Sequence, residues 1–488
     1  MIETRSDLFR PQYHFTAPQG WINDPNGLVF FQGEYHLFYQ HKRPLHWGHA
    51  VSPDLIHWQH LPIALAPDEL GDIWSGSVVV DWNDTSGFFD GGSGLVAIFT
   101  HHTPQSQSQS LAFSRDNGRT WNKYAGNPVL TSAERDFRDP KVFWHAPTER
   151  WAMVLATGTS VSFYTSTDLR TWVFTSRFTS DGLPGVWECP DMFALPVDED
   201  PARIQWVLNV SSTTPVHVRG GAISMHYFVG NFDGECFSAL TGPLPTTYGA
   251  DDYAAVSWSD IPHGDGRRIW LGWMSHWNYA RQVPTDPWQG MLTLPRGLTL
   301  RSHAQEIRLV QQPVRELEAL RRETHTWHDQ AIGWGDSTGD GNFLAGMEVD
   351  ACEIIAEFEV TERKTLASEF GLRIRVGEHQ ETRIGYIVAA ETLFVDRTRS
   401  GASDFHPGFP TRHIAPLSFT NGRLKLQIFV DRCSIEVFGN DGAAYLADLI
   451  FPDQRAQKLE IYADSGAVTL SSLKLYHLAS IWDDQTER

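Results

Sequence analysis

A turn that recurs three times in the first half of the chain constrains its fold more than any other feature. A Ser-x-Asp turn followed by a tryptophan stands at 52–58, 114–121 and 166–172. Serine and aspartate side chains close such turns on the backbone, and the tryptophan can then begin the next strand. Recurrence of one four-stranded unit about every 40 to 60 residues is typical of a β-propeller, although Asp-rich turns also occur in other β proteins.

Short strands fill residues 14–300. Apolar runs such as 27–31, 94–100 and 268–274 are separated by Gly, Pro, Asn and Asp, as in strands joined by turns. About 300 residues of such units correspond to about five blades. We therefore predict an all-β protein in which residues 1–300 form a five-bladed β-propeller.

The pattern changes after residue 300. Val314, Leu317 and Leu320 follow helical spacing, which predicts a helical linker over 301–324 that packs between two domains. From 325 to 488, β-rich segments recur every 10 to 15 residues with no helical pattern between them. This predicts a C-terminal β-sandwich.

The charge balance limits the partners of this chain. Asp and Glu outnumber Lys and Arg by 59 to 39, and the formal net charge is −20. Such a surface repels phosphate, so neither nucleic acid nor a membrane is expected as a partner. No apolar run approaches the length of a membrane span, and no signal peptide is visible at the start. We expect a cytoplasmic protein, although a secreted mature form without its signal would look the same.

Cysteine and histidine spacing predicts no cofactor. The four cysteines form neither a CxxC pair nor the density of a disulfide framework. The 21 histidines show no HExxH or comparable ligand spacing. We therefore expect no metal site.

Three acidic clusters are candidates for chemistry. Asp24 lies in a turn-rich motif, Asp139 follows an arginine and precedes a proline, and Glu188 stands between a tryptophan and a cysteine. Taken singly, they could be ordinary turns or surface ion pairs. A propeller would gather them around one axial pocket, and two carboxylates flanking a glycosidic bond are sufficient for its hydrolysis. Partial burial of Glu188 would raise its pKa, as a general acid requires.

In their order along the chain, these motifs resemble those of glycoside hydrolase family 32, which contains invertases, levanases, exo-inulinases and fructosyltransferases. The resemblance covers both halves of the chain and implies a five-bladed propeller followed by a β-sandwich. The motifs are WINDPNG (21–27), WSGS (74–77), FRDP (137–140), WECP (187–190), GWMSHW (272–277), LPRGL (294–298) and IFVDRCSIEVF (428–438).

The resemblance implies a role for each carboxylate. Asp24 corresponds to the nucleophile, Glu188 to the general acid/base and Asp139 to the stabiliser of the transition state. Aromatic side chains are expected to stack on sugar rings, although core packing is the alternative for most of the 19 tryptophans. The expected substrate-binding residues are Asn23, Gln40, Trp47, Trp74, Ser75, Arg138, Asp251 and Trp273.

Two departures from the family pattern adjoin the expected substrate pocket. The stretch 41–46 is shorter than usual, so an aromatic wall is missing or comes from elsewhere. Asp252 stands where the family commonly has Phe. Neither departure touches the three carboxylates, so both bear on which fructoside is preferred.

The predicted reaction is hydrolysis, with retention, of a terminal β-D-fructofuranoside from sucrose, fructo-oligosaccharides or fructan. One alternative is fructosyl transfer, in which a sugar hydroxyl replaces water. A non-catalytic carbohydrate-binding protein is a second alternative, and the presence of all three carboxylates disfavours it. A family 43 type pentosidase is a third, and the WINDPNG motif argues against it.

The second domain has no comparable set of paired carboxylates. Asp431 and Glu436 are its best acidic candidates, and we expect them to serve a turn and a cross-strand pair. The domain is therefore expected to support the propeller and to offer a surface for homo-oligomer formation. Deletion of 325–488 is expected to yield insoluble protein.

Overall fold

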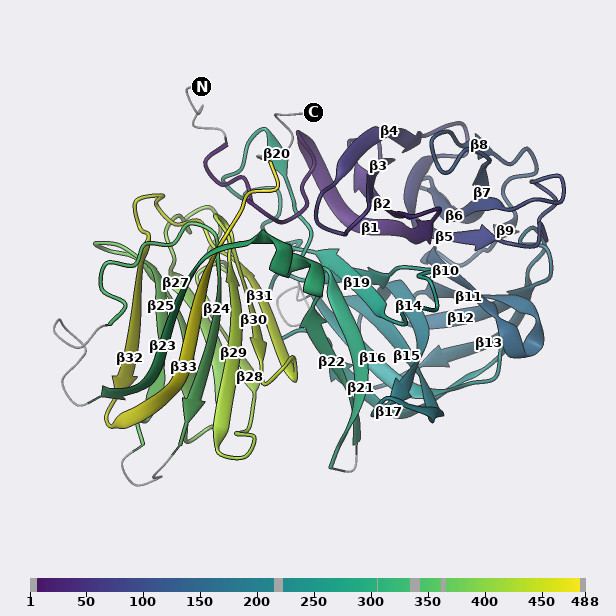
Figure 1. The fold of residues 1–488 in the computed structure, drawn as a ribbon. Helices are drawn as coiled ribbons and strands as arrows, with labels where there is room; N and C mark the ends of the chain where they lie inside the picture. The colour runs from purple at the N-terminus through teal and green to yellow at the C-terminus, as the bar shows by residue number, and fades with distance from the viewer. Residues whose placement is uncertain (1–6, 215–222, 305, 334–342, 361–365, 483–488) are drawn as a thin grey trace.

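The computed structural model describes residues 7–214, 223–304, 306–333, 343–360 and 366–482. Helical structure in these residues is limited to short 3₁₀ turns, among them η2 (Ala146–Thr148) and η3 (Arg315–Leu320). The prediction of an all-β protein is confirmed. Within the described residues, no helix is long and apolar enough to cross a bilayer. Figure 1 shows two bodies of strands side by side, one coloured purple to teal and the other green to yellow.

Three sheets follow one another along the first part of the chain, and consecutive strands are antiparallel neighbours in each, except that the last strand of the second sheet, β9, pairs with β7. The first contains β1 (Gly20–Phe31), β2 (Glu34–His41), β3 (His46–Ser52) and β4 (Gln59–Leu65), the second β5 (Asp72–Asp81), β6 (Gly94–His102), β7 (Gln107–Ser114), β8 (Asn122–Lys123) and β9 (Leu130–Thr131), and the third β10 (Phe137–His145), β11 (Arg150–Thr157), β12 (Ser160–Ser166) and β13 (Val173–Thr179).

A fourth, larger sheet completes this body. One parallel bridge, Val197↔Leu300, joins its two halves. The late strand β20 (Trp288–Gln289) pairs with β1, so the end of the body returns to its beginning. The sheet contains β14 (Val186–Val197), β15 (Asp200–Thr213), β16 (Ile223–Phe232), β17 (Phe237–Pro245), β18 (Tyr253–Ser257), β19 (Arg268–Trp273), β21 (Arg296–His303) and β22 (Glu306–Pro313).

Each Ser-x-Asp turn of the sequence repeat connects the third and fourth strands of its sheet. The aspartate accepts hydrogen bonds from the backbone of the turn, as Asp54 Oδ1 does from His57 N at 2.8 Å and Asp168 Oδ1 from Thr171 N at 2.7 Å. The following tryptophan donates its indole N–H to a carbonyl of the same turn, at 2.8 Å for Trp172. The repeat therefore marks equivalent corners of successive sheets.

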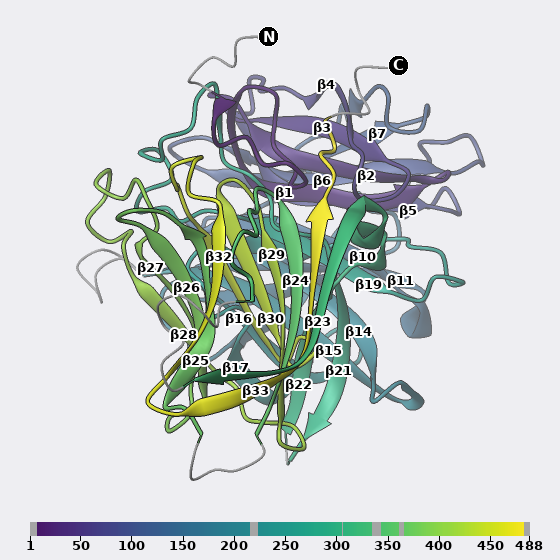
Figure 2. The same ribbon diagram turned by 60° about the vertical axis from the view of Figure 1, so that its left-hand side comes forward.

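The second body consists of two sheets that enclose one hydrophobic core. Figure 2 shows them facing each other with their long strands roughly aligned. One sheet contains β23 (Arg321–Gly333), β33 (Ala467–Leu478), β24 (Cys352–Glu359), β29 (Arg423–Val430), β30 (Ser434–Gly439) and β31 (Ala444–Leu449), and the other β28 (Arg412–Pro416), β27 (Thr392–Arg399), β26 (Glu381–Ile387), β25 (Glu369–Val376) and β32 (Lys458–Asp464).

The two bodies share a further hydrophobic core. Phe15 and Leu294 from the first part of the chain and Phe438, Tyr445 and Phe451 from the second belong to one buried cluster. Backbone hydrogen bonds also cross the boundary, for example from Asp251 N to Ala447 O at 3.0 Å. The sandwich-like body is therefore built into the first body rather than tethered to it.

The predicted helical linker over 301–324 is wrong. Most of this segment is strand, because β22 pairs with β21 along its length, and only η3 is helical. Val314, Leu317 and Leu320 are buried, as expected for a segment between the bodies. Their spacing of three residues fits one face of a 3₁₀ helix, which has 3.0 residues per turn, as well as it fits an α-helix.

Candidate active site

A cavity of about 250 Å³ lies where five strands begin. β1, β5, β10, β14 and β18 each direct at least one side chain into it. Each of these strands has a register shift at that point, against its neighbour in the sheet. Such bulges bend a strand and re-aim its side chains, which explains how five strands can converge on one small space.

Asp24 is held by two neighbouring donors. Asn23 Nδ2 donates to Asp24 Oδ1 at 3.0 Å, and Ser75 Oγ donates to Asp24 Oδ2 at 2.8 Å. The thiol of Cys189 lies 3.4 Å from the same Oδ2. These contacts orient the carboxylate, whose side chain remains partly accessible from the cavity.

Asp139 is the most deeply buried of the three carboxylates, with 6% of its surface exposed. Its Oδ2 accepts a hydrogen bond from Cys189 N at 3.0 Å, and Arg138 Nε lies 3.8 Å away. Burial raises the pKa of Asp139 to about 7; the charges of Glu188 and Asp24 add to this, whereas Arg138 and the Cys189 amide oppose it. The surroundings of Asp139 therefore oppose its ionisation more than water does.

Each carboxyl oxygen of Glu188 accepts a hydrogen bond. Arg138 Nη2 donates to Oε1 at 3.0 Å and Tyr253 OH donates to Oε2 at 2.6 Å. Burial and the nearby Glu188 charge raise the pKa of Tyr253 well above its usual value, so the phenol stays protonated as a donor. The side chain of Glu188 is 21% exposed, so it can reach a bound molecule.

Five of the eight predicted substrate-binding residues line this cavity: Asn23, Gln40, Trp74, Ser75 and Arg138. Gln40 is informative because it is 1% exposed and neither its amide nitrogen nor its amide oxygen has a partner among the described residues. A buried polar group without a partner is costly, and a ligand with hydroxyl groups would supply one.

The other three predicted residues lie elsewhere, which corrects the expectation that they contact substrate. Trp47 is fully buried behind the cavity wall, where its indole N–H donates to Trp74 O at 3.0 Å. Trp273 is fully buried beneath Trp277, with ring centroids 4.5 Å apart. Both tryptophans therefore support rings that line the site.

Asp251 is also fully buried and points toward the second body. Its Oδ2 pairs with Arg397 at 2.5 Å and its Oδ1 accepts a hydrogen bond from Tyr279 OH at 2.6 Å. The neighbouring departure, Asp252, pairs with the buried Arg296 at 2.7 Å and does not line the cavity either. Tyr253, the first residue of β18, thus enters the site, whereas the two aspartates just before the strand point away from it.

Several lining residues escaped prediction from sequence. Arg43 and Leu45 come from the shortened 41–46 stretch, which was recognised as a departure but not as a wall of the site. Tyr253 directly follows Asp251, the predicted site residue, and Asp252, the departure from the family pattern. Arg281 comes from the loop after β19. Trp277, in the same loop, was not missed: it belongs to the GWMSHW motif and is one of the tryptophans expected to stack on sugar rings.

Among the residues that the structure describes, no group of three possible metal donors close enough to share an ion lies in the cavity, where Arg138 stands beside Asp139 and Glu188. Among the described residues, one group of three donors close enough to share an ion is Glu323, His325 and His477. This group lies on β23 and β33, in the second body, and does not line the cavity.

Comparison with known proteins identifies similar chains over nearly the whole length. Residues 14–313 match the model of the glycosyl hydrolases family 32 N-terminal domain, and residues 316–477 match the model of the glycosyl hydrolases family 32 C-terminal region. A levanase of Bacillus subtilis (strain 168) is 50% identical over 97% of this chain and 71% of its own length.

A levanase of Bacillus sp. (strain L7) is 42% identical over 98% of this chain, which spans only 53% of that protein. The crystal structure of exo-inulinase from Aspergillus awamori superposes with a TM-score of 0.87 at 33% identity, over 97% of this chain and 99% of that one. The likeness therefore includes both bodies of the fold.

Proposed function

The chain belongs to glycoside hydrolase family 32 and is a glycosidase, and we propose that its cavity releases terminal β-D-fructofuranosyl units from fructans and sucrose with retention. One observation carries the proposal: Asp24, Asp139 and Glu188, from three different strands, meet in one cavity. Levanases and exo-inulinases among its relatives act on fructans, which supports this substrate class.

The geometry supports a double displacement. Asp24, oriented by Asn23 and Ser75, attacks C2 of fructose while the bond from C2 to the leaving oxygen breaks. Glu188 gives its proton to that oxygen. Water then attacks C2 of the fructosyl–enzyme, its proton passes to Glu188 and the Asp24 carboxylate is restored.

Arg138 and Tyr253 position Glu188, because each donates a hydrogen bond to a different oxygen of its carboxyl group. Asp139, buried beside both reacting carboxylates, faces the positive charge that develops on the fructosyl ring and stabilises it electrostatically. Gln40 offers an unpaired amide for a sugar hydroxyl.

The size of the cavity favours removal of single units from chain ends. At about 250 Å³ it is smaller than the roughly 300 to 1,000 Å³ of sites for drug-sized ligands. Trp74, Leu45 and Arg43 wall it on the side of the shortened stretch. The site therefore suits one terminal fructosyl unit rather than the middle of a long chain.

We propose further that the first body is a five-bladed propeller and the second a β-sandwich. The blades are β1–β4, β5–β8, β10–β13, β14–β17 and the group β18, β19, β21 and β22. This division is supported by the five inner strands that share the cavity, and by the pairing of β20 with β1 where the ring would close.

Product analysis tests the function. The protein is incubated with sucrose, inulin and levan, and products are separated over time, with a folded Asp24→Asn variant as control. From inulin and levan, fructose is expected as the only early product, first appearing as the β-furanose by NMR, whereas sucrose should yield fructose and glucose in equal amounts. New, larger oligosaccharides would indicate transfer, which the hydrolases among the relatives do not favour, and an α-anomer would overturn retention.

A further inference from the structure

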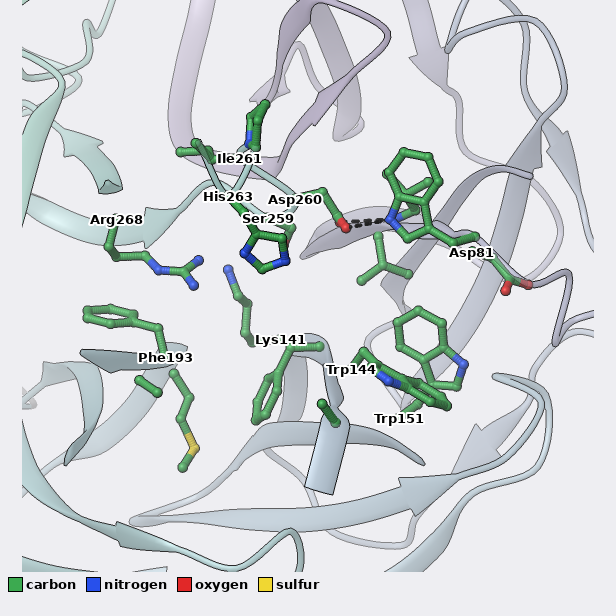
Figure 3. Close-up of a pocket in the computed structure, with 18 of the residues that line it drawn as sticks. Asp81, Lys141, Trp144, Trp151, Phe193, Ser259, Asp260, Ile261, His263 and Arg268 are labelled. Carbon is green, nitrogen blue, oxygen red and sulfur yellow. Dashed lines mark hydrogen bonds between the residues drawn. The ribbon is translucent and has the colours of Figure 1, made fainter. Parts of the chain in front are cut away.

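A second cavity, of about 650 Å³, lies at the opposite ends of the same strands (Figure 3). β10 carries Asp139 into the catalytic cavity and, further along, Phe143 and Trp144 into the second one. β14 likewise carries Glu188 into the first and Phe193 into the second. The two cavities therefore lie at opposite ends of the axis around which these strands are arranged.

A buried ion pair separates the cavities. Lys141 Nζ pairs with Asp191 at 2.8 Å and donates to Ser257 O at 2.8 Å, and the three residues are 5%, 0% and 1% exposed. The space on the catalytic side of this pair measures only about 10 Å³, which is roughly the volume for one water molecule. The second cavity is thus a separate site and not an extension of the first.

Aromatic side chains form much of the wall of the second cavity. Phe143, Trp144, Trp151, Phe193 and Trp206 all line it. Trp144 packs against Trp151 in a T-shaped arrangement, with ring centroids 5.2 Å apart and an angle of 73°, yet remains 39% exposed. A ring held by a neighbouring ring and still exposed is suited to stack on an apolar face of a ligand.

Polar groups converge on the same space. Figure 3 shows the guanidinium of Arg268 and the imidazole of His263 directed into it. Arg268 Nη1 donates to Trp258 O at 2.8 Å, while its Nε is buried with no hydrogen-bond partner in the described part of the chain. Asp260 accepts from the indole N–H of Trp82 at 3.0 Å, and Trp82 is 55% exposed.

The charged groups of this cavity have partners of their own. Lys141 and Arg268 are opposed by Asp260, which also lines the cavity, and by Asp191 beside it. Arg267 is held by Asp265 and Glu316, and Asp81 accepts hydrogen bonds from Thr85 and Ser86. A balanced set of donors and acceptors gives no net attraction for a phosphate or a carboxylate. Together with the aromatic wall, it matches a neutral molecule that donates and accepts hydrogen bonds and has an apolar face, as a sugar does.

We propose that this second cavity binds a fructosyl segment of the polymeric substrate. The inference rests on the proposed function, since a fructan presents many identical units, and a chain held at one end of the axis raises the concentration of chain ends around the catalytic cavity. Binding there therefore lowers KM for long fructans and leaves sucrose unaffected.

Kinetics of Trp144→Ala test the inference, with Phe174→Ala as matched control because Phe174 is a 52% exposed aromatic on β13 of the same sheet, outside the cavity. We expect KM for levan to rise by about tenfold, with kcat and all constants for sucrose unchanged. Trp144→Phe, which keeps an aromatic face, restores most of the loss. Equal constants on levan for wild type and Trp144→Ala would overturn the inference.

A binding titration separates the inference from the proposed function. Glu188→Gln, which is expected to bind without turnover, is titrated calorimetrically with a fructo-oligosaccharide, and two sites per chain are expected, reduced to one when Trp144→Ala is added. One site in both proteins overturns the inference even if the wild type hydrolyses levan. Binding of inorganic phosphate with loss on Trp144→Ala, and none of the oligosaccharide, also overturns it. No hydrolysis of any fructoside by the wild type defeats the proposed function itself.

Discussion

The acidic residues of the catalytic cavity and those buried between the two bodies have opposite electrostatic surroundings. In the cavity, Arg138 lies 3.0 Å from Glu188 and 3.8 Å from Asp139, and it also pairs with Asp136 at 2.7 Å. Burial and like charge raise the pKa of Asp139 to about 7. Negative charge is thus only partly compensated where a ligand can reach it.

Between the bodies, the two buried carboxylates share one cation and have further fixed hydrogen-bond donors. His14 lies 1% exposed with Nδ1 2.7 Å from Asp431 and Nε2 2.8 Å from Glu436. Although burial disfavours their charges, hydrogen bonds and attraction from His14 hold the pKa of both carboxyls below the usual values. Burial lowers the pKa of His14, but the two carboxylates outweigh it and raise that pKa to about 9.

This difference distinguishes carboxylates that can take part in catalysis from carboxylates that stabilise the fold. A carboxylate whose charge is met by fixed partners stabilises the fold, and one left partly unmet beside a cavity can act on a substrate. Asp431 and Glu436 were expected to serve a turn and a cross-strand pair. The structure instead joins them to the N-terminal segment through His14 and places neither in the catalytic cavity.

The largest effect is expected from Asp24→Asn. Because the substitution keeps the size of the side chain but removes the nucleophile, kcat should fall by roughly 10⁴-fold or more with little change in Tm. Steady-state rates on sucrose and a thermal melt measure both. A folded variant with near-wild-type kcat would contradict the assignment of this residue.

The second-largest effect is expected from Glu188→Gln. We expect kcat on sucrose to fall by about 10² to 10⁴-fold, because proton donation to the leaving oxygen is lost. An aryl β-fructofuranoside, whose leaving group needs little protonation, should lose much less in the first step. Equal losses on both substrates would show that Glu188 is not the acid.

His14→Ala should affect stability alone. It leaves Asp431 and Glu436 buried without their cation, so the free energy of unfolding should fall by about 3 to 5 kcal/mol. The kcat of the folded fraction should stay within about twofold of wild type, because His14 does not line the cavity. Denaturant melts and active-site-normalised rates measure the two quantities; a large loss of kcat at full stability would break the comparison.

The buried cluster of His14, Asp431 and Glu436 predicts that stability depends on pH. The pKa of His14 is raised, so its contribution is complete below its unfolded pKa of about 6.5 and is lost as the pH rises through about 9. The pKa values of Asp431 and Glu436 are lowered in the folded protein. The contribution of these carboxylates to stability is therefore complete above their unfolded pKa values and is lost as the pH falls through their folded ones. Melts of His14→Gln should lack the alkaline decline, which amounts to at most about 3 kcal/mol in the wild type. An unchanged alkaline decline in the variant would assign it to another group.

The smallest effect is expected for a solvent-exposed ion pair on the protein surface. Arg115 and Asp90 pair at 2.9 Å with side chains 52% and 82% exposed. Since solvent screens such pairs, Arg115→Ala should change the free energy of unfolding by less than about 1 kcal/mol. A loss as large as that of His14→Ala would mean that burial does not explain the difference between the two regions.

Prediction from sequence succeeded where a residue acts through local chemistry. The Ser-x-Asp turns close on their own backbone, so the repeat could be read directly and lies at equivalent corners of three sheets. It failed where one spacing fits two structures, as with Val314, Leu317 and Leu320, which lie on a 3₁₀ turn after a strand.

By itself, the sequence determined the all-β class, the corner turns and the three carboxylates that meet in the cavity, because local hydrogen bonds, strand alternation and motif identity are written in neighbouring residues. Only the tertiary structure decided which way the remaining side chains face. Trp47 and Trp273 lie behind the cavity and Asp251 points to the other body, whereas Tyr253 enters the site. Register shifts at the start of the inner strands interrupt the simple alternation of faces, and the final direction of a side chain depends on distant partners, such as Arg397 for Asp251.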